Sequence, residues 1–291
     1  MDLKSYILAA RPKTLPAAVV PVWLGCVLAW YLTGSYDGWL AFYTLMGAVW
    51  IQIGTNFFND AIDADKGADT EKRLGPVRAT ASGLLSRKVV YGSAIICLGI
   101  AAVFGFLLYQ ARGWEIIAIG IPSLYLCYGY TGGPWPLAYK GLGEIFVILF
   151  FGLIAVMGTT FVQLGEWRVE AAVLGLQIGL LSAVLISINN LRDREEDAGN
   201  NKRTLAVVLG EKPAKKIILL ELFLPAVIGI YWYLIGASAF TFIPLVYLAF
   251  ALPLAGGVMT SAPSERYNKF LALGGMQLLL FGGLFTLACL L

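Results

Sequence analysis

Long stretches without a charged residue dominate the chain, and short polar connections separate them. A helix needs about 20 mostly apolar residues to cross a bilayer. Nine stretches approach or exceed this length, at 14–36, 38–59, 89–110, 116–139, 145–165, 171–191, 222–236, 237–263 and 270–291. The seventh is expected to begin nearer Lys215, and its boundary with the eighth falls in one uncharged run near Gly236. The pattern predicts an all-α membrane protein with nine transmembrane helices.

The positions of lysine and arginine give these helices an orientation. With the N-terminus in the cytosol, nine crossings place every one of the 21 basic residues on the cytosolic side except Arg112 and Arg168. Basic residues concentrate in the cytosolic loops of membrane proteins. We therefore predict a multi-pass protein of the cell inner (cytoplasmic) membrane, with its N-terminus and its longer loops in the cytosol.

The composition excludes several classes of protein. Hydrophobic residues make up 59% of the chain and charged residues 13%, which is too little polar surface for a soluble domain of this size. Histidine is absent, which rules out histidine acid–base catalysis and histidine-ligated haem or zinc. The four cysteines lie singly inside apolar segments and are expected to pack there. The net charge of +3 is explained by the cytosolic loops, so we predict no nucleic-acid partner.

An Asn-x-x-x-Asp motif occurs twice, each time at the end of a long apolar segment. Asn56 and Asp60 end the second segment, whereas Asn189 and Asp193, followed by Asp197, end the sixth. Residues four apart lie on one face of a helix, so the oxygens of each motif can converge. Mg2+ favours a few carboxylates, waters and substrate phosphates over a complete protein cage. Each motif therefore predicts a magnesium site.

The recurrence of this motif also predicts an internal duplication. A single membrane domain would consist of two similar halves, at about 1–140 and 141–291, with about four helices each and the ninth helix extra. Three polar connections would converge on the cytosolic side. Two are acidic, at 60–71 and 193–211, and the third, at 131–140, is rich in glycine and proline and has Lys140 as its single cation.

Two magnesium motifs would attract a diphosphate. Nearby cations can neutralise the negative charge that develops when the diphosphate leaves. The cations near the motifs are Lys66, Lys72, Arg73, Arg78, Lys202 and Arg203. If the diphosphate is attached to an allylic chain, its loss leaves a carbocation. An apolar cavity between the helices would hold the lipid tail and keep water away from that cation.

Four stretches, in order along the chain, resemble the UbiA superfamily of intramembrane aromatic prenyltransferases. They are RPKT at 11–14, the segment 56–78 that ends in GPVR, TGGPWPLAYKGLGE at 131–144 and NNLRDREEDAGNNKRTLAVVLG at 189–210. The aspartate motifs are similar to those of the whole superfamily. The TGGPWPLAY and KRTLAVVLG stretches are most similar to the branch that acts on 1,4-dihydroxy-2-naphthoate in menaquinone biosynthesis.

The resemblance implies a nine-helix bundle whose central cavity, capped by cytosolic loops, binds Mg2+, an isoprenyl diphosphate and the aromatic acceptor. It implies that the prenyl group replaces the carboxylate of 1,4-dihydroxy-2-naphthoate as CO2, giving demethylmenaquinone. The metal ligands it implies are Asp60, Asp63, Asp69, Asp193 and Asp197. The diphosphate contacts are Asn56, Arg73, Arg78, Asn189, Lys202 and Arg203, and the catalytic residues are Asp60, Asp193 and Lys140.

Simpler interpretations compete with individual assignments. Acidic residues in a loop are usually just solvated, although two matched clusters argue against this. The orientation rule alone accounts for a basic residue in a cytosolic loop. An aromatic group could line the acceptor pocket or form an ordinary interfacial belt; its members are Tyr125, Tyr128, Tyr130, Trp135 and Tyr139. Glu144 could favour a helix dipole, and Glu221 has no explanation at this level.

Other functions remain open on the sequence alone. Within the same superfamily, the acceptor could be 4-hydroxybenzoate or homogentisate, or the donor could carry a phytyl chain. A secondary transporter also uses repeats, but it would place its polar groups near the middle of the membrane. A structural protein would have no reason to duplicate Asn-x-x-x-Asp.

Overall fold

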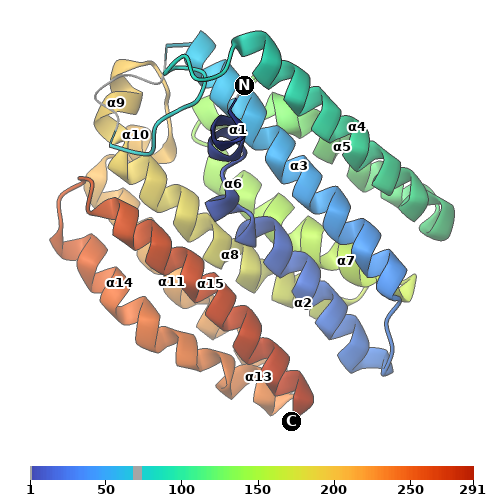
Figure 1. Ribbon diagram of the computed structural model, residues 1–291. Coiled ribbons are helices and arrows are strands. Elements are labelled where there is room, and N and C mark those ends of the chain that lie inside the picture. Colours follow the sequence, from blue (N-terminus) through green and yellow to red (C-terminus); the bar gives the residue numbers. More distant parts are fainter. Residues whose placement is uncertain (1, 68–73) are drawn as a thin grey trace.

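The computed structural model describes residues 2–67 and 74–291, and within these residues the chain is helical and contains no β-strand. The long helices lie roughly side by side, with the N-terminus beside α1 at one end of the bundle and the C-terminus at the other (Figure 1). The helices of the first part are α1 Leu3–Ala10, η1 Pro12–Thr14, α2 Pro16–Thr33, α3 Gly38–Asp65, α4 Arg87–Arg112, α5 Trp114–Gly129 and η2 Leu137–Tyr139. Those of the second part are α6 Gly143–Val147, η3 Ile148–Ile154, α7 Ala155–Leu164, α8 Val169–Arg192, α9 Arg194–Gly199, α10 Leu205–Leu209, α11 Glu211–Ile228, α12 Ile230–Leu234, α13 Ser238–Phe242, η4 Pro244–Tyr247, α14 Leu248–Thr260 and α15 Tyr267–Leu290.

Seven helical segments in the described part of the chain are long and apolar enough to cross a membrane. They are Pro16–Thr33, Arg87–Arg112, Gly143–Leu164, Val169–Arg192, Glu211–Leu234, Ser238–Thr260 and Tyr267–Leu290. The chain is therefore a multi-pass membrane protein, as predicted. Two further helices coincide with predicted segments: α3, with 28 residues, and α5, which is apolar but has only 16.

Several predicted boundaries were wrong, each for a local reason. The segment 116–139 ends ten residues early, because α5 stops at Gly129 and the glycines and prolines that follow do not continue a helix. The segment 38–59 is too short, since α3 continues to Asp65 and carries the whole first motif on helix. The seventh helix begins at Glu211, earlier than expected, because its polar first turns are helical as well. The eighth is broken near Pro244, where η4 separates α13 from α14.

Side-chain contacts fix the end of the bundle that is farther from the motifs. The carboxylate of Asp37 accepts hydrogen bonds from the first amides of α3 and caps that helix. The guanidinium of Arg112 donates to the backbone oxygens of Val162 and Gln163, at the last turn of α7. Arg112, one of the two cations on the side predicted to be outside, therefore satisfies the C-terminal carbonyls of a neighbouring helix.

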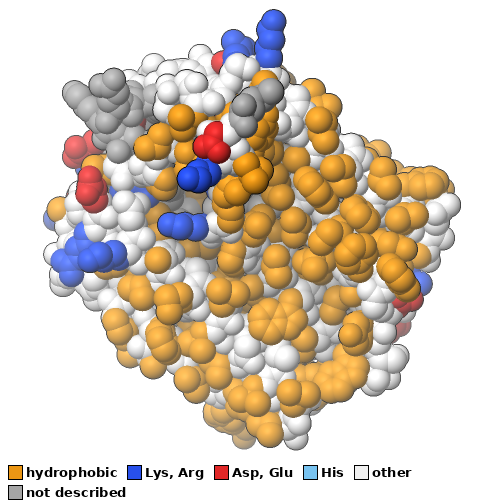
Figure 2. All heavy atoms as spheres, in the orientation of Figure 1, with side chains coloured by type: hydrophobic (Ala, Val, Ile, Leu, Met, Phe, Trp, Pro, Cys, Tyr) orange, Lys and Arg blue, Asp and Glu red, His pale blue; other side chains and the backbone are white. Residues whose placement is uncertain are grey.

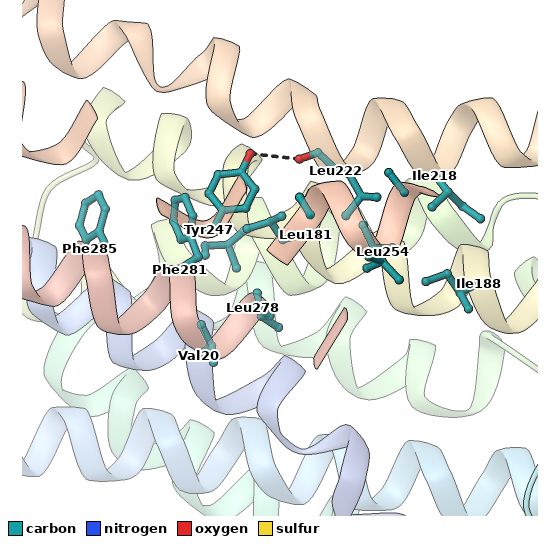
Figure 3. Close-up of a cluster of buried hydrophobic side chains, with 14 of the residues drawn as sticks. Val20, Leu181, Ile188, Ile218, Leu222, Tyr247, Leu254, Leu278, Phe281 and Phe285 are labelled. Atoms are coloured by element: carbon teal, nitrogen blue, oxygen red, sulfur yellow. Dashed lines mark hydrogen bonds between the residues drawn. The ribbon is translucent and has the colours of Figure 1, made fainter. Parts of the chain in front are cut away.

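The largest buried cluster joins α8 to α2, α11, α14 and α15. Leu181 and Ile188 of α8 lie among aromatic and aliphatic side chains of the surrounding helices (Figure 3). The hydroxyl of Tyr247 donates to the backbone oxygen of Leu222 at 3.0 Å, which satisfies a polar group inside this cluster (Figure 3). A second cluster joins α1, α3, α4 and α5. The helix that ends in the second motif is thus central, whereas the helix that carries the first motif lies to one side.

Three glycines allow α8 to approach the π-helical segment η3 with backbone against backbone. A Cβ atom on Gly152 would lie 2.3 Å from the oxygen of Gly175 and 2.4 Å from Cα of Gly179. Such distances leave no room for a side chain. The close approach of small residues is a common way to pack helices within a membrane, and it fixes the position of α8 relative to η3.

Charged side chains gather at one end of the bundle. On the face shown in Figure 2, hydrophobic side chains cover most of the surface, and Lys, Arg, Asp and Glu cluster near the end that carries α1, α9 and α10, apart from a small group at the opposite end. Both Asn-x-x-x-Asp motifs belong to this charged end, because α3 runs toward it and α8 runs toward it from the other half of the chain (Figure 1).

Candidate active site

The first motif lies on the last turns of α3 and is buried. Asn56 is 3% exposed and Asp60 is 1% exposed. Asn56 Nδ2 donates to the backbone oxygen of Ala10 at 2.8 Å and to Thr14 Oγ1 at 2.9 Å. These contacts explain why the N-terminal stretch belongs to the site, since the turn after α1 holds the amide of Asn56 in one orientation.

Asp60 binds the backbone of the loop that precedes α4. Its two carboxylate oxygens accept hydrogen bonds from the amide of Ala79 at 3.1 Å and from the amide of Thr80 at 2.8 Å. Backbone N–H groups that are buried need an acceptor, and the carboxylate supplies two. Asp60 therefore holds this loop over the end of α3.

Asp63, one turn further along α3, joins the first motif to two other segments. Asp63 Oδ1 accepts a hydrogen bond from the hydroxyl of Tyr139 at 2.9 Å, and its Oδ2 lies 3.7 Å from Arg78 Nη2. Arg78 is itself largely buried, with 9% of its side chain exposed. The predicted metal ligand Asp63 and the predicted diphosphate contact Arg78 thus lie together.

The second motif begins on α8 and contains an internal ion pair. Arg192 Nε lies 2.7 Å from Asp193 Oδ1 and Arg192 Nη2 lies 2.7 Å from Asp193 Oδ2, so the guanidinium binds both carboxylate oxygens. Arg192 Nη2 also donates to Asn189 Oδ1 at 2.8 Å. Asp193 lies between the end of α8 and the short α9, and the amide of Asp197 in α9 donates to the backbone oxygen of Asp193 at 2.8 Å.

Asp197 is the point at which the two motifs approach each other. It lies in α9 and forms an ion pair with Lys202 at 3.3 Å. Burial raises the pKa of Asp197 to about 6, with Lys202 opposing that rise and the charges of Asp193 and Asp63 adding to it. Asp197 Oδ2 is buried and has no hydrogen-bond partner. Lys202 links the two motifs, because its Nζ pairs with Asp197 and lies 5.9 Å from the ring centroid of Tyr139, whose hydroxyl binds Asp63.

Tyr139 lies among the cations of the site. Lys66 Nζ is 3.9 Å from the centroid of its ring and Lys202 Nζ is 5.9 Å from it, while its hydroxyl binds Asp63. Lys66 Nζ also donates to the backbone oxygen of Thr131 at 2.6 Å. Burial lowers the pKa of Lys66, and the charge of Asp63 partly offsets this effect. Ammonium groups over an aromatic face are stabilised by the ring quadrupole, so Tyr139 positions cations as well as a carboxylate.

Not every predicted residue joins this group. Lys140 and Arg203 are exposed and form no ion pair in the part of the chain that the structure describes. Asp69 and Arg73 lie outside the described residues. Asp65, in the same acidic run, binds Arg87 at 2.8 Å and the hydroxyl of Tyr91 at 3.0 Å, and so contacts α4 instead.

The residues of the site fit a magnesium ion that keeps few protein ligands. Within residues 2–67 and 74–291, no three acidic, cysteine or histidine side chains form a group that could hold a metal by themselves. Buried Asp197 Oδ2 nevertheless has no hydrogen-bond partner, and Asp63 of the other motif is linked to Asp197 through Tyr139 and Lys202. Oxygen donors without nitrogen or sulfur suit Mg2+, whose remaining positions are filled by water and phosphate oxygens.

Several partners of the site escaped the sequence analysis. The orientation rule alone accounts for Arg192 as a basic residue, and Asn268 lies in neither motif. Asn268 Oδ1 accepts a hydrogen bond from Arg192 Nη1 at 2.6 Å. Glu221, which had no explanation, accepts a hydrogen bond from the hydroxyl of Ser187 at 2.8 Å. Spacing along the chain gives no sign of these contacts, because they join different helices.

A polar site with two aspartate motifs at one end of an all-helical membrane bundle is the architecture of an intramembrane prenyltransferase. The chain belongs to the UbiA prenyltransferase family, whose model matches residues 18–285. The predicted resemblance is therefore confirmed, and the protein is a prenyltransferase enzyme.

Named relatives lie within this family. The chain is 34% identical over 279 residues to the 1,4-dihydroxy-2-naphthoate octaprenyltransferase of Mycobacterium tuberculosis, over 95% of this chain and 93% of that protein. It is 32% identical over 244 residues to the 1,4-dihydroxy-2-naphthoate octaprenyltransferase of Bacillus subtilis, over 84% of this chain and 78% of that protein.

The fold is that of solved UbiA homologues. The structure of a UbiA homologue from Archaeoglobus fulgidus bound to GPP and Mg2+ matches with a TM-score of 0.74, over 99% of this chain and all of that chain. The sequences are only 14% identical, so this likeness concerns the arrangement of the helices alone.

Proposed function

We propose that the protein transfers an isoprenyl chain from an isoprenyl diphosphate to 1,4-dihydroxy-2-naphthoate, with loss of CO2 and diphosphate, and so forms demethylmenaquinone. The relatives at 32% and 34% identity are named for this acceptor, and they cover most of the chain. They are also named octaprenyltransferases, which makes octaprenyl diphosphate the first donor to test.

The observation that carries this proposal is the approach of the two motifs at one charged end of an apolar bundle. Asp63 of the first motif and Asp197 of the second are linked through Tyr139 and Lys202, and Arg78 and Lys66 lie beside this link. Such a mixture of carboxylates and cations can bind a metal and a diphosphate at once. The apolar helices below it provide room for a chain that water does not reach.

A bound Mg2+ ion would supply charge neutralisation for the leaving diphosphate. We propose Asn56, Asp60, Asp63 and Asp197 as its protein ligands, together with the predicted Asp69. Asp193, a predicted ligand and catalytic residue, is paired with Arg192 and is considered separately below.

The cations of the site would hold the diphosphate oxygens. Arg78 lies next to the carboxylate of Asp63, and Lys202 lies next to that of Asp197. Lys66 lies over the ring of Tyr139. Preorganised cations stabilise the charge that grows as the carbon–oxygen bond breaks. Lys140, Arg73 and Arg203 remain proposed contacts of the outer loops.

The apolar part of the donor needs a separate place. A cavity of about 490 Å³ lies between α2 and the start of α3, and its lining is aliphatic and aromatic. The lining residues are Val19, Val22, Trp23, Cys26, Val27, Trp30, Tyr36, Ala41, Phe42 and Leu45. The turn before α2 and the helix α3 are hydrogen-bonded to each other through Thr14 of η1 and Asn56 of α3. We propose that this cavity, which we call the α2–α3 groove, takes the distal part of the isoprenyl chain.

We further propose nine crossings, with α3 and α5 added to the seven apolar spans, in a single domain of two similar halves. The motifs at the ends of α3 and α8, which run in the same direction, support this arrangement. The excess of basic residues at the motif end supports a cytosolic position for the N-terminus and the site, in a cell inner membrane.

The direct test uses membranes that contain the protein, Mg2+ and labelled octaprenyl diphosphate. The expected result is label in a product of 1,4-dihydroxy-2-naphthoate, with release of CO2 from its carboxylate, and no label in 4-hydroxybenzoate. Geranylgeranyl and phytyl diphosphates, offered in place of the octaprenyl donor, measure the preference for the chain. Label in 4-hydroxybenzoate alone would contradict the proposed acceptor.

A further inference from the structure

The first Asn-x-x-x-Asp motif leaves an amide oxygen available. Asn56 Nδ2 donates to the backbone oxygen of Ala10 and to Thr14 Oγ1. Because a backbone carbonyl oxygen can only accept, the amide nitrogen has to face Ala10. Asn56 Oδ1 is the atom left over, and it makes no hydrogen bond to any residue that the structure describes. A neutral amide oxygen of this kind is a ligand for a hard cation.

In the second motif, the NH2 group of the asparagine is available, and not its oxygen. Asn189 Oδ1 accepts a hydrogen bond from Arg192 Nη2 at 2.8 Å. A guanidinium can only donate, so the oxygen of Asn189 has to face Arg192. The NH2 group of Asn189 is left over, and it has no acceptor among the described residues. This group can donate to an anion, but it cannot bind a metal ion.

Arg192 is a fixed part of the second motif. Four of the five N–H donors of its guanidinium are used, on Asn189, on Asn268 and twice on Asp193. Its side chain is 0% exposed. Asn268 is held in turn, because its Nδ2 donates to the backbone oxygen of Leu74 at 3.0 Å. Withdrawing Arg192 would leave the carboxylate of Asp193 buried without its cation, which is costly.

We propose that the two motifs have different roles. The first motif binds the divalent cation, with Asn56 Oδ1 as a neutral ligand. The second motif binds a diphosphate oxygen through the NH2 group of Asn189, and Arg192 serves as the permanent counter-ion of Asp193. In this arrangement Asp193 is a positioning residue that orients Arg192 and Asn189 and does not ligate a metal. The inference rests on the proposed function, which supplies the diphosphate.

The charges support this division of roles. Asp193 and Arg192 together carry no net charge, so they offer little attraction to a second divalent cation. Asp197 Oδ2 has no hydrogen-bond partner. Asp197 is therefore the carboxylate of the second motif that can bind the metal ion held by the first motif. One cation held between Asp63 and Asp197 would lie beside Tyr139 and Lys202, which already link the two motifs, since Tyr139 binds Asp63 and Lys202 pairs with Asp197.

Two matched substitutions test the asymmetry, with Mn2+ as a paramagnetic probe in place of Mg2+. The full chain is placed in lipid nanodiscs, and Mn2+ binding is titrated by electron paramagnetic resonance. Asn56→Ala is expected to weaken Mn2+ binding about 10-fold or more, whereas Asn189→Ala leaves it within about twofold of the unsubstituted chain. Equal losses in the two variants would overturn the proposal, as would a larger loss for Asn189→Ala.

A second titration uses inorganic pyrophosphate at a fixed Mn2+ concentration. Asn189→Ala is expected to weaken pyrophosphate binding about 10-fold, because a donor to the anion is lost. Asn189→Asp should weaken it further, since a carboxylate oxygen replaces the NH2 group. Asn56→Asp, which retains an oxygen at the metal, should restore much of the Mn2+ binding that Asn56→Ala loses. If Asn189→Asp bound pyrophosphate as well as the unsubstituted chain, the proposal would fail.

Substitutions of Arg192 give an independent test, in which the number of bound metal ions is measured. Arg192→Lys keeps the charge and is expected to leave the number of bound Mn2+ ions unchanged. Arg192→Met takes the guanidinium away from Asp193 and from Asn189 Oδ1, and it is expected to add one Mn2+ site per chain. If Arg192→Met does not fold, the double variant Arg192→Met/Asp193→Asn, which removes both buried charges, gives the answer. A loss of Mn2+ binding as large as that of Asp60→Asn would overturn the proposal.

The same preparations separate this inference from the proposed function. Prenyl transfer by the unsubstituted chain, together with equal dependence of Mn2+ binding on both motifs, would refute the inference and leave the function standing. A chain that binds neither Mn2+ nor pyrophosphate and transfers no prenyl group would refute both.

Discussion

The hydroxyl of Tyr139 donates a 2.9 Å hydrogen bond to Asp63 Oδ1, which joins the loop after α5 to the buried aspartates of α3. The ring of the same tyrosine lies 3.9 Å from Lys66 Nζ. One side chain therefore orients a carboxylate of the first motif and places a cation next to it. Through this contact the glycine- and proline-rich loop reaches the first motif, whereas Lys140 at the end of the same loop is exposed.

Tyr139→Phe is expected to lower prenyl transfer about tenfold, because it removes a hydrogen bond to a charged group but keeps the ring under Lys66. The rate of transfer at saturating donor is the measurement. Tyr139→Leu, which removes the ring as well, should be slower still. Full activity in Tyr139→Phe would mean that the hydroxyl has no role in orienting Asp63.

Asp60→Asn is expected to lower turnover about 100-fold or more, since charge near the departing diphosphate is usually a large part of catalysis. It also removes one of the oxygens that accept from Ala79 and Thr80. Labelled product formed by membranes is the measurement, with protein content checked by immunoblot. Asp65→Asn is the control, because Asp65 lies on the same helix but binds Arg87. Equal activity in both variants would remove Asp60 from the site.

Asp193→Asn is expected to destabilise the fold by about 3–5 kcal/mol, because it leaves the guanidinium of Arg192 buried without its counter-ion. Thermal unfolding in detergent, followed by tryptophan fluorescence, measures this loss. The double variant Arg192→Met/Asp193→Asn removes both charges and should recover most of the lost stability. A double variant less stable than the single one would contradict the assigned pairing.

Gly152→Ala is expected to cost about 1–3 kcal/mol of stability, because the added methyl group has no space between η3 and α8. Gly99→Ala on α4 is the matched control, as nothing lies within 4 Å of its added Cβ. It should be neutral or stabilising, since alanine favours a helix over glycine. The difference between the two unfolding temperatures tests the backbone contact.

Cys26→Trp is expected to shift the preferred donor toward shorter chains, because the indole ring fills part of the α2–α3 groove. Product formation with geranyl, geranylgeranyl and octaprenyl diphosphates is the measurement. Ile95→Trp adds the same ring on α4, where residue 95 is exposed, and should leave the preference unchanged. An unchanged preference in Cys26→Trp would place the chain elsewhere.

The sequence was sufficient for the broad architecture because membrane helices are long, apolar and bounded by charge. It located the regions around α2, α4, α8 and α15 within a few residues, and it identified both aspartate motifs. Boundaries failed where helices continue into polar sequence. At Asp65 and Glu211, helices extend past the apolar run because charged residues do not end a helix that emerges from the membrane.

The details of the site depended on hydrogen-bond partners that the motif spacing does not specify. Arg192 looked like one of many cytosolic cations, and only the structure places it against Asp193, Asn189 and Asn268. Asn56 and Asn189 hold the same position in the two copies of the motif, but their neighbours differ. The amide nitrogen of Asn56 is bound by the protein, whereas in Asn189 it is the amide oxygen that is bound. A repeated pattern predicts similar positions, whereas the hydrogen-bond partners decide what each position offers.

The glycine contact between η3 and α8 restricts how the bundle can change shape. Two backbones that touch without side chains between them have no layer that could slide or open. If the α2–α3 groove holds the isoprenyl chain as proposed, a long hydrophobic product would leave on that flank, past α2 and α3. Release into the lipid would then depend on movement of α2, while the second aspartate motif stays anchored.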